Sequence, residues 1–344
     1  MSRIRAILYA FLAAVFYAVN VPASKVLLAG VGPASMAALL YLGAGLGVSI
    51  LSLVNRKDST GSEKLTGKDL PFVIGMIVLD TAAPIFLMLG ISYGSSANAS
   101  LLGNFEIAAT AVIALLIFKE PISGRLWAAI ALITLSSILL SVEGTDSFRF
   151  SYGSLFVLAA AVCWGFENNC TRMISSKSTY EIVVIKGVFS GLGSLIIALI
   201  KREPVPAAGY IAAALLLGFV SYGLSIFLYV RAQSVLGASK TSAYYAVAPF
   251  VGSFLSFVFL RDRLSRMYLS ALIIMIAGSA LVVTDTLIRH HTHLHQHTFT
   301  HTHGGSTHTH TVTHSHAHDH YVTDNEHGHR HTLKELEQLP GAAH

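Results

Sequence analysis

Three carboxylic acids, Asp80, Glu106 and Glu167, lie inside long apolar stretches of this chain. An acid at the centre of a membrane-spanning helix costs about 2.5–3.5 kcal/mol on insertion scales, so it faces a cavity or another helix in preference to lipid. Two interpretations stay open for each acid. It is either protonated and hydrogen-bonded between helices, or it is a site that binds a proton or a cation. Glu106 is the clearest case, because it lies near the middle of its apolar stretch.

Amides and tyrosines near these acids could complete a cavity. Asn104 lies two residues before Glu106, and Asn168 directly follows Glu167. Further candidates for the lining of a substrate or coupling-ion cavity lie on neighbouring stretches: Asn20, Asn98, Tyr222, Tyr244 and Tyr245. A tyrosine near a membrane surface also fits the aromatic belt, and this alternative stays open for Tyr222 and Tyr245.

The basic residues near these stretches have two interpretations. Lys186 is a candidate ionic partner for the acids, but it lies roughly two turns into its stretch and could also extend to the membrane surface. Two pairs of charges follow apolar stretches, where a helix-end role explains them without a function: Lys119 with Glu120, and Arg261 with Asp262.

The composition is that of a membrane protein. Hydrophobic residues make up 53% of the chain and charged residues 12%, whereas soluble proteins carry about 25% charged residues. The net charge is +5, but the basic residues lie between apolar stretches, a pattern of membrane topology and not of a nucleic-acid-binding surface. The sequence contains no glycine-rich loop with Walker spacing, so we expect no ATP hydrolysis. We also expect that the protein is not an enzyme.

Ten apolar stretches of roughly 18–22 residues predict ten membrane-spanning helices. Their predicted limits are 5–28, 34–54, 70–91, 97–118, 125–142, 152–173, 181–200, 209–231, 239–260 and 267–287. Arg3 and Arg5 precede the first stretch as in a signal peptide, but we interpret it as a retained helix because its repeat partner is internal. The distribution of lysine and arginine predicts an integral protein of the plasma or bacterial inner membrane, with both termini in the cytoplasm.

The chain repeats itself. Four residues of the first half align with residues of the second half: Ser100 with Ser242, Glu120 with Asp262, Ser123 with Ser265, and, further upstream, Lys25 with Arg172. Each repeat holds five predicted spans, an odd number, so the second copy enters the membrane from the opposite side. We therefore expect an all-α membrane protein with two inverted five-helix repeats, residues 1–142 and 143–289. Such repeats can exchange conformations, which is the physical basis of alternating access.

Several short motifs mark the two halves. Three recur in register: the openings Phe16-Tyr17-Ala18 and Trp164-Gly165, the following Lys25 and Arg172, and the acids Glu120 and Asp262. The second half adds the turn Gly237-Ala238-Ser239 and Pro249. This pattern resembles the EamA-type ten-helix transporters of the drug/metabolite transporter superfamily, over about residues 4–287.

The resemblance implies two five-helix bundles around a central cavity, with the fifth and tenth helices at the periphery. Members of the family move amino acids, other small metabolites, sugar-phosphate conjugates or drugs, so the substrate stays open. The first half departs from the pattern in having Ser95-Ser96-Ala97 in place of Gly-Ala-Ser. It also has Ile107 where the second half has Pro249, so we expect the fourth helix to be straighter than the ninth.

All 17 histidines lie at or beyond residue 290, mostly at every second position, with Thr, Ser or Gly between them. We expect residues 290–344 to be a disordered cytoplasmic tail, because the segment has too little apolar surface to fold alone. Neutral imidazole binds Zn, Ni, Co and Cu, so we expect the tail to bind such ions, although transport requires no cofactor. The predicted ligands are His291, His293, His295, His297, His301, His303, His308, His310, His314, His316, His318, His320, His327, His329 and His331.

Three functions fit the sequence. The leading interpretation is a secondary active transporter that exports a small organic metabolite, coupled to protons, by alternating access. The second is a transporter of a transition-metal ion or metal chelate, with the tail as metal collector or sensor. The third is a non-transporting membrane metal sensor. The expected partners are the lipid bilayer, a small-molecule substrate and transition-metal ions, without nucleic acid, and association into a homodimer stays open.

Metal binding by the tail can be tested separately from transport. We expect the tail to bind several Zn or Ni ions per chain, and to bind them more weakly below about pH 6.5, because protonated imidazole is not a ligand. If the tail is a regulator, deleting residues 290–344 should leave transport intact and remove its response to metal. The measurement is flux by full-length and truncated protein, each with and without metal. Complete loss of flux in a correctly inserted truncated protein would place the tail in the transport path.

Overall fold

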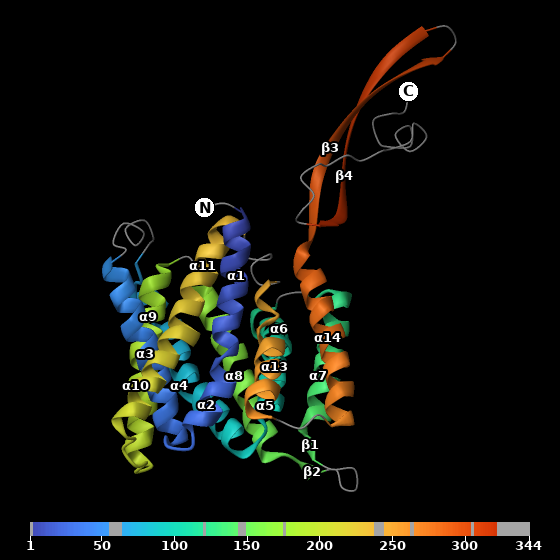
Figure 1. Cartoon of the computed structure of the whole chain (residues 1–344). Coiled ribbons are helices and arrows are strands. Elements are labelled where there is room, and N and C mark those ends of the chain that lie inside the picture. The colour runs from blue at the N-terminus through green and yellow to red at the C-terminus, as the bar shows by residue number, and fades with distance from the viewer. Residues whose placement is uncertain are drawn as a thin grey trace. The chain divides into compact units, whose positions relative to one another are not determined.

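The computed structural model describes residues 3–54, 64–119, 122–143, 149–174, 177–236, 244–261, 265–303 and 306–321 (Figure 1). Residues 1–283 form one compact unit, which is a bundle of helices, and residues 284–344 belong to a second unit. Expectations that fall on Glu120, Asp262, residues 237–243 and residues 322–344 lie outside the described residues.

The first half of the bundle contains seven described α-helices and one 3₁₀ turn. They are α1 (Arg3–Ala18), α2 (Asn20–Leu27), α3 (Pro33–Val54), η2 (Gly67–Asp69), α4 (Leu70–Tyr93), α5 (Ser96–Leu102), α6 (Phe105–Phe118) and α7 (Gly124–Ser141). A short antiparallel pair, β1 (Val142–Glu143) and β2 (Arg149–Phe150), connects the halves. The second half contains α8 (Tyr152–Met173), α9 (Thr179–Ile200), α10 (Ala208–Gly218), the π-helix η3 (Phe219–Leu224), α11 (Ser225–Leu236), α13 (Ala248–Leu260) and α14 (Arg266–Leu287).

Eight helical segments of the described chain are long and apolar enough to cross a membrane. They are Ile4–Leu27, Pro33–Leu53, Gly67–Tyr93, Ser96–Ile117, Gly124–Ser141, Tyr180–Ile200, Ala208–Tyr229 and Arg266–Asp285. The apolar helix α13 is shorter, and α8 has 22 residues, several of them polar. The protein is therefore an integral membrane protein by the length and composition of its helices.

The first long helices of the two halves begin at opposite ends of the bundle. Helix α1 begins at the end of the bundle where the N-terminus lies, whereas α8, the first long helix of the second half, begins at the opposite end, beside β1 and β2 (Figure 1). Local details repeat as well. The hydroxyl oxygens of Ser123 and Ser265 each accept a hydrogen bond of 3.0 Å at a helix start, from the backbone N–H groups of Leu126 and Tyr268. Lys119 and Arg261 end α6 and α13 in the same left-handed conformation.

Several spans are interrupted near their middle. The first is divided at Val19 into α1 and α2, and the fourth is divided at Gly103 and Asn104 into α5 and α6. A turn at Ala246 and Val247 precedes α13. The fourth span is thus interrupted although it lacks the proline of the ninth. Glycine is a poor helix former, so Gly103 can interrupt a helix as proline does elsewhere.

Glycine allows a close approach of α3 and α9. A Cβ atom added to Gly187 on α9 would lie 2.6 Å from the backbone of Gly45 on α3, and one added to Gly45 would lie 2.8 Å from the backbone nitrogen of Val188. The backbones of α3 and α9 thus touch where glycine removes the side chain, as is common between membrane helices. This contact joins the second long helix of the first half, α3, to the second long helix of the second half, α9.

The second unit contains a long antiparallel hairpin of β3 (Ile288–His303) and β4 (Ser306–Tyr321). The structure thus differs from the expected disorder of the tail over these residues. Alternation of histidine with threonine has the period of a strand, and β-branched threonine favours extended backbone even where apolar residues are few. The register places His291 opposite His318 and His293 opposite His316.

Enlarging Gly187 should separate α3 from α9. We expect Gly187→Val to lower the free energy of unfolding by about 1–3 kcal/mol, as overpacking of a tight contact commonly does. Gly209→Val is the matched control, because nothing lies within 4 Å of a Cβ atom added there. Thermal unfolding of the purified variants measures the difference. Equal melting temperatures for the two variants would contradict the tight α3–α9 contact.

Candidate functional site

The amino group of one lysine joins two of the three buried acids. Lys186 on α9 lies 3.0 Å from Asp80 Oδ2 on α4 and 2.9 Å from Glu167 Oε1 on α8. Asp80 is completely buried and Glu167 is 2% exposed. Lys186 therefore points into the bundle, where it neutralises carboxylates that would otherwise repel each other, and does not extend to a membrane surface.

Hydroxyl groups support the same ion pairs. The Tyr41 hydroxyl on α3 donates a hydrogen bond of 2.9 Å to Asp80 Oδ1. The Thr171 hydroxyl, one turn after Glu167 on α8, donates to Glu167 Oε1. Four helices, α3, α4, α8 and α9, thus contribute polar side chains to one point. Buried charges are tolerated in such an arrangement, because each carboxylate accepts a hydrogen bond from a hydroxyl group in addition to its ion pair with Lys186.

The third acid, Glu106, lies in the first turn of α6 and is partly buried. Its Oε1 atom accepts a hydrogen bond of 2.7 Å from the Asn168 amide, and the same amide donates to the Thr110 hydroxyl at 3.3 Å. Asn169 donates to the backbone oxygen of Thr110 at 3.1 Å. Asn168 and Asn169 of α8 therefore both contact α6, whereas the preceding residue, Glu167, contacts Lys186 on α9. Successive side chains on a helix point about 100° apart, so neighbouring residues can reach different helices.

A chain of tyrosines lies beside the acids. Tyr41 contacts Tyr222 with a ring-centroid distance of 5.3 Å, and Tyr222 contacts Tyr17 edge to face at 5.9 Å. Tyr17 contacts Tyr245 at 5.8 Å, and Tyr245 contacts Tyr229 at 5.2 Å. The rings thus extend from the Asp80 ion pair, to which Tyr41 donates a hydrogen bond, as far as Tyr229 on α11.

Two asparagines behave differently in the interior. Asn20, at the start of α2, is 1% exposed, and it donates a hydrogen bond of 3.0 Å to the Tyr222 hydroxyl and accepts one from Ser24. Asn104, at the break between α5 and α6, is also 1% exposed, but neither polar atom of its side chain has a hydrogen-bond partner among the described residues. An unsatisfied buried amide in a native structure calls for a physical explanation, such as a bound ligand or water.

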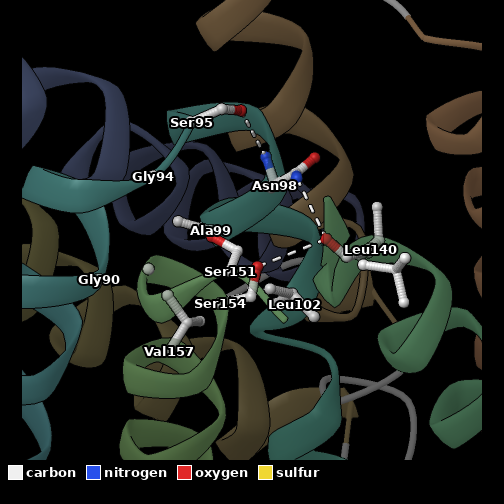
Figure 2. A pocket seen from close by; sticks show the side chains of 12 residues that line it. Gly90, Gly94, Ser95, Asn98, Ala99, Leu102, Leu140, Ser151, Ser154 and Val157 are labelled. Atoms are coloured by element: carbon white, nitrogen blue, oxygen red, sulfur yellow. Dashed lines mark hydrogen bonds between the residues drawn. The ribbon is translucent and has the colours of Figure 1, made fainter. Parts of the chain in front are cut away.

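Two of the predicted cavity residues lie elsewhere. Tyr244 packs against Phe11 at 5.3 Å, next to a small apolar cluster of α1 and α11. Asn98 lines a separate pocket at the junction of α4, α5, α7 and α8, where its amide donates to the Leu140 backbone oxygen at 3.3 Å (Figure 2). The twelve residues that line this pocket are uncharged, so the pocket is distinct from the acidic site.

Tyr17 and Tyr41 belong to the site but were not candidates from the sequence. In the sequence, Tyr17 stands out only as part of the opening motif Phe16-Tyr17-Ala18 of the first span. It precedes Asn20 by three residues, and this helical spacing could have placed the two on one face. Tyr41 lies in an apolar, glycine-rich helix, and nothing in its local sequence distinguishes it from an interfacial tyrosine.

The site has different chemistry at equivalent positions of the two repeats. In the register that aligns Tyr17 with Trp164, Asn20 aligns with Glu167; in the register that aligns Ser123 with Ser265, Asp80 aligns with Tyr222. The hydrogen bond from Asn20 to Tyr222 is therefore the counterpart of the Glu167–Lys186–Asp80 contact. One side of the pseudo-symmetric site is neutral, and the other side is charged.

The comparisons with known proteins agree with this architecture. The sequence profile of the EamA-like transporter family matches residues 4–142 and 151–284. An uncharacterized transporter of Methanothermobacter thermautotrophicus is 25% identical over 287 residues, which are 77% of this chain and 82% of that protein. The uncharacterized transporter YyaM of Bacillus subtilis is 23% identical over 199 residues, which are 54% of this chain and 63% of that protein. A protein crystal structure with 18% identity has the same fold, with a TM-score of 0.59 over 83% of this chain and 98% of its own.

Replacing Lys186 should leave Asp80 and Glu167 without the cation that neutralises them. We expect Lys186→Met to lower the free energy of unfolding by about 3–5 kcal/mol, because it leaves Asp80 and Glu167 without their cation. The triple variant that adds Asp80→Asn and Glu167→Gln should recover most of this loss. Lys201→Met, at the exposed end of α9, is the control. Thermal unfolding measures all three proteins, and an unchanged melting temperature for Lys186→Met would show that these ion pairs do not stabilise the bundle.

Proposed function

The chain belongs to the EamA-like transporter family, and from this premise we propose that it is a proton-coupled secondary transporter that exports a small organic metabolite. Membership in a transporter family also argues against an enzymatic role. We propose ten membrane-spanning helices in all, with α8 and the α13 segment as the two spans beyond the eight long apolar ones.

The observation that carries the proposal is the imbalance of charge in the site. Asp80, Glu106 and Glu167 face one lysine, Lys186, whose two ion pairs engage Asp80 and Glu167. Glu106 has the neutral amide of Asn168 as its partner. An ionised carboxylate in an apolar interior that lacks a cation binds a proton or a cation. Glu106 is therefore our candidate for the proton carrier.

The interrupted helices suggest how the site could open to each side in turn. Secondary transporters place substrate and coupling ion where broken helices of inverted repeats meet near the membrane midplane. Here Asn20 and Asn104 lie at two such breaks, and Glu106 lies in the first turn after the second break. We propose that Glu106 takes up a proton on one side of the membrane and releases it on the other as the halves exchange conformations.

The histidine hairpin supports a second role, metal binding by the tail. Its register sets His291, His293 and His295 opposite other histidines, so positions for several imidazole ligands lie close together along the backbone. We propose that the tail, on the cytoplasmic side with the N-terminus, binds Zn, Ni, Co or Cu as a regulator. Transport of a metal ion or chelate, and metal sensing without transport, are the alternatives. The acidic site offers carboxylate, amide and phenol oxygens, which suit protons and hard cations better than these metals.

Flux through reconstituted vesicles tests the proposal. Proteoliposomes loaded with a mixture of cellular metabolites and given a pH gradient should release particular compounds, which mass spectrometry identifies. Glu106→Gln should reduce this gradient-dependent release to background while the protein remains folded and inserted, because an amide cannot exchange a proton.

The matched control is Asp69→Asn, which removes a carboxylate at the start of α4, outside the site. It should release the same compounds as the wild type. Wild-type flux by Glu106→Gln over a range of pH would remove Glu106 from the mechanism. Absence of any pH-dependent flux by the wild type would refute proton-coupled transport.

A further inference from the structure

We infer that the tail holds its most tightly bound metal ion on one face of the β3–β4 hairpin, at a site centred on His293 and His316. The ligand is a transition-metal dication that accepts imidazole nitrogen, such as Zn²⁺. This inference rests on the proposed metal binding by the tail, and it adds the place and the geometry of the site.

The register of the hairpin gathers its histidines on one face. Successive residues of a strand alternate between its two faces, and directly opposite residues of an antiparallel pair share a face. Twelve of the thirteen histidines in β3 and β4 therefore belong to one face, and His290 belongs to the other. The twelve are His291, His293, His295, His297, His301, His303, His308, His310, His314, His316, His318 and His320. Threonine is the commonest residue at the positions of the opposite face.

Three consecutive cross-strand pairs on this face consist of histidine alone. They are His291 with His318, His293 with His316, and His295 with His314. Cβ atoms of directly opposite residues lie about 4.5–5.5 Å apart, and the next pair on the same face follows about 6.4–6.8 Å along the strand. A Zn–N bond is about 2.0–2.1 Å long. Two neighbouring pairs therefore have the spacing at which four imidazoles can coordinate one tetrahedral ion.

The middle pair of this ladder takes part whichever neighbouring pair supplies the other two imidazoles. One more pair of histidines, His301 with His308, lies closer to the turn. Each pair beside it contains a residue that is not histidine, Phe299 on one side and Ser306 on the other. It therefore offers fewer imidazoles at this spacing, and we expect it to bind metal more weakly.

An ion held by both strands also stabilises the hairpin. A two-stranded hairpin alone is only marginally stable in water. An ion that binds the paired strands more tightly than the separated ones adds its binding free energy to their pairing. Metal occupancy is thereby converted into a change in the order of the backbone, which gives the proposed regulation by the tail a physical basis.

Single substitutions on the two faces test the inference, with Zn²⁺ as the probe. Calorimetric titration of purified full-length protein measures the affinity of its tightest site. His293→Ala should weaken this affinity at least tenfold. His316→Ala, on the other strand, should weaken it to a similar extent, because the ion is shared between the strands. His290→Ala is the matched control, three residues from His293 but on the opposite face, and it should leave the affinity unchanged.

Two outcomes would overturn the site but not metal binding by the tail. Equal effects of His290→Ala and His293→Ala would mean that the face of the hairpin does not matter, as in a flexible chelating chain. Unchanged affinity in His316→Ala would mean that β4 takes no part. The proposed metal binding fails in a different way, and the site fails with it, if the wild type binds Zn²⁺ no more tightly than the variant that lacks residues 290–344.

Discussion

The contact of Lys186 with Asp80 and Glu167 constrains the packing of the whole bundle. Each of these charges would be costly alone in an apolar interior, and the three are tolerable because the Lys186 amino group lies 3.0 Å from Asp80 and 2.9 Å from Glu167. Asp80, Glu167 and Lys186 come from α4, α8 and α9, and Tyr41 of α3 donates a hydrogen bond to Asp80, so these four helices cannot shift independently. The close α3–α9 contact at Gly45 and Gly187 lies one turn from Tyr41 and beside Lys186, and it brings both side chains within reach of the acids.

A site with this much buried charge also has a reason to be mobile. The interruptions at Val19, Gly103 and Val247 divide spans into shorter helices that can tilt separately. Glu106 follows one interruption, and Asn20 follows another. Groups that change their protonation or their ligand thus lie beside the backbone positions that can bend most easily. A change of charge at Glu106 would act directly on the packing of α6 against α8 through Asn168.

Much of this architecture could be predicted from the sequence, because apolar length and repeated motifs are local signals. The acids Asp80, Glu106 and Glu167 could be identified as site candidates from the sequence, because charged residues are rare in apolar stretches. The structure places Asp80 and Glu167 beside one lysine, Lys186. The tyrosines were harder to predict, since Tyr17 and Tyr244 look alike in sequence but one reaches the site and the other packs on Phe11. Only tertiary packing distinguishes them. The hairpin of the tail could not be predicted from composition, which favours disorder, because the period-two alternation of histidine and threonine favours strands.

The neutral and charged sides of the pseudo-symmetric site bear on the history of the molecule. A five-helix ancestor that paired with an identical copy would have placed the same residues on both sides. Asn20 opposite Glu167, and Tyr222 opposite Asp80, are combinations that identical copies cannot make. The difference between the two sides is possible only because the two copies lie in one chain and differ in sequence. The first half carries Asp80, whose cation, Lys186, belongs to the second half, so the first half alone would leave this carboxylate without its ionic partner.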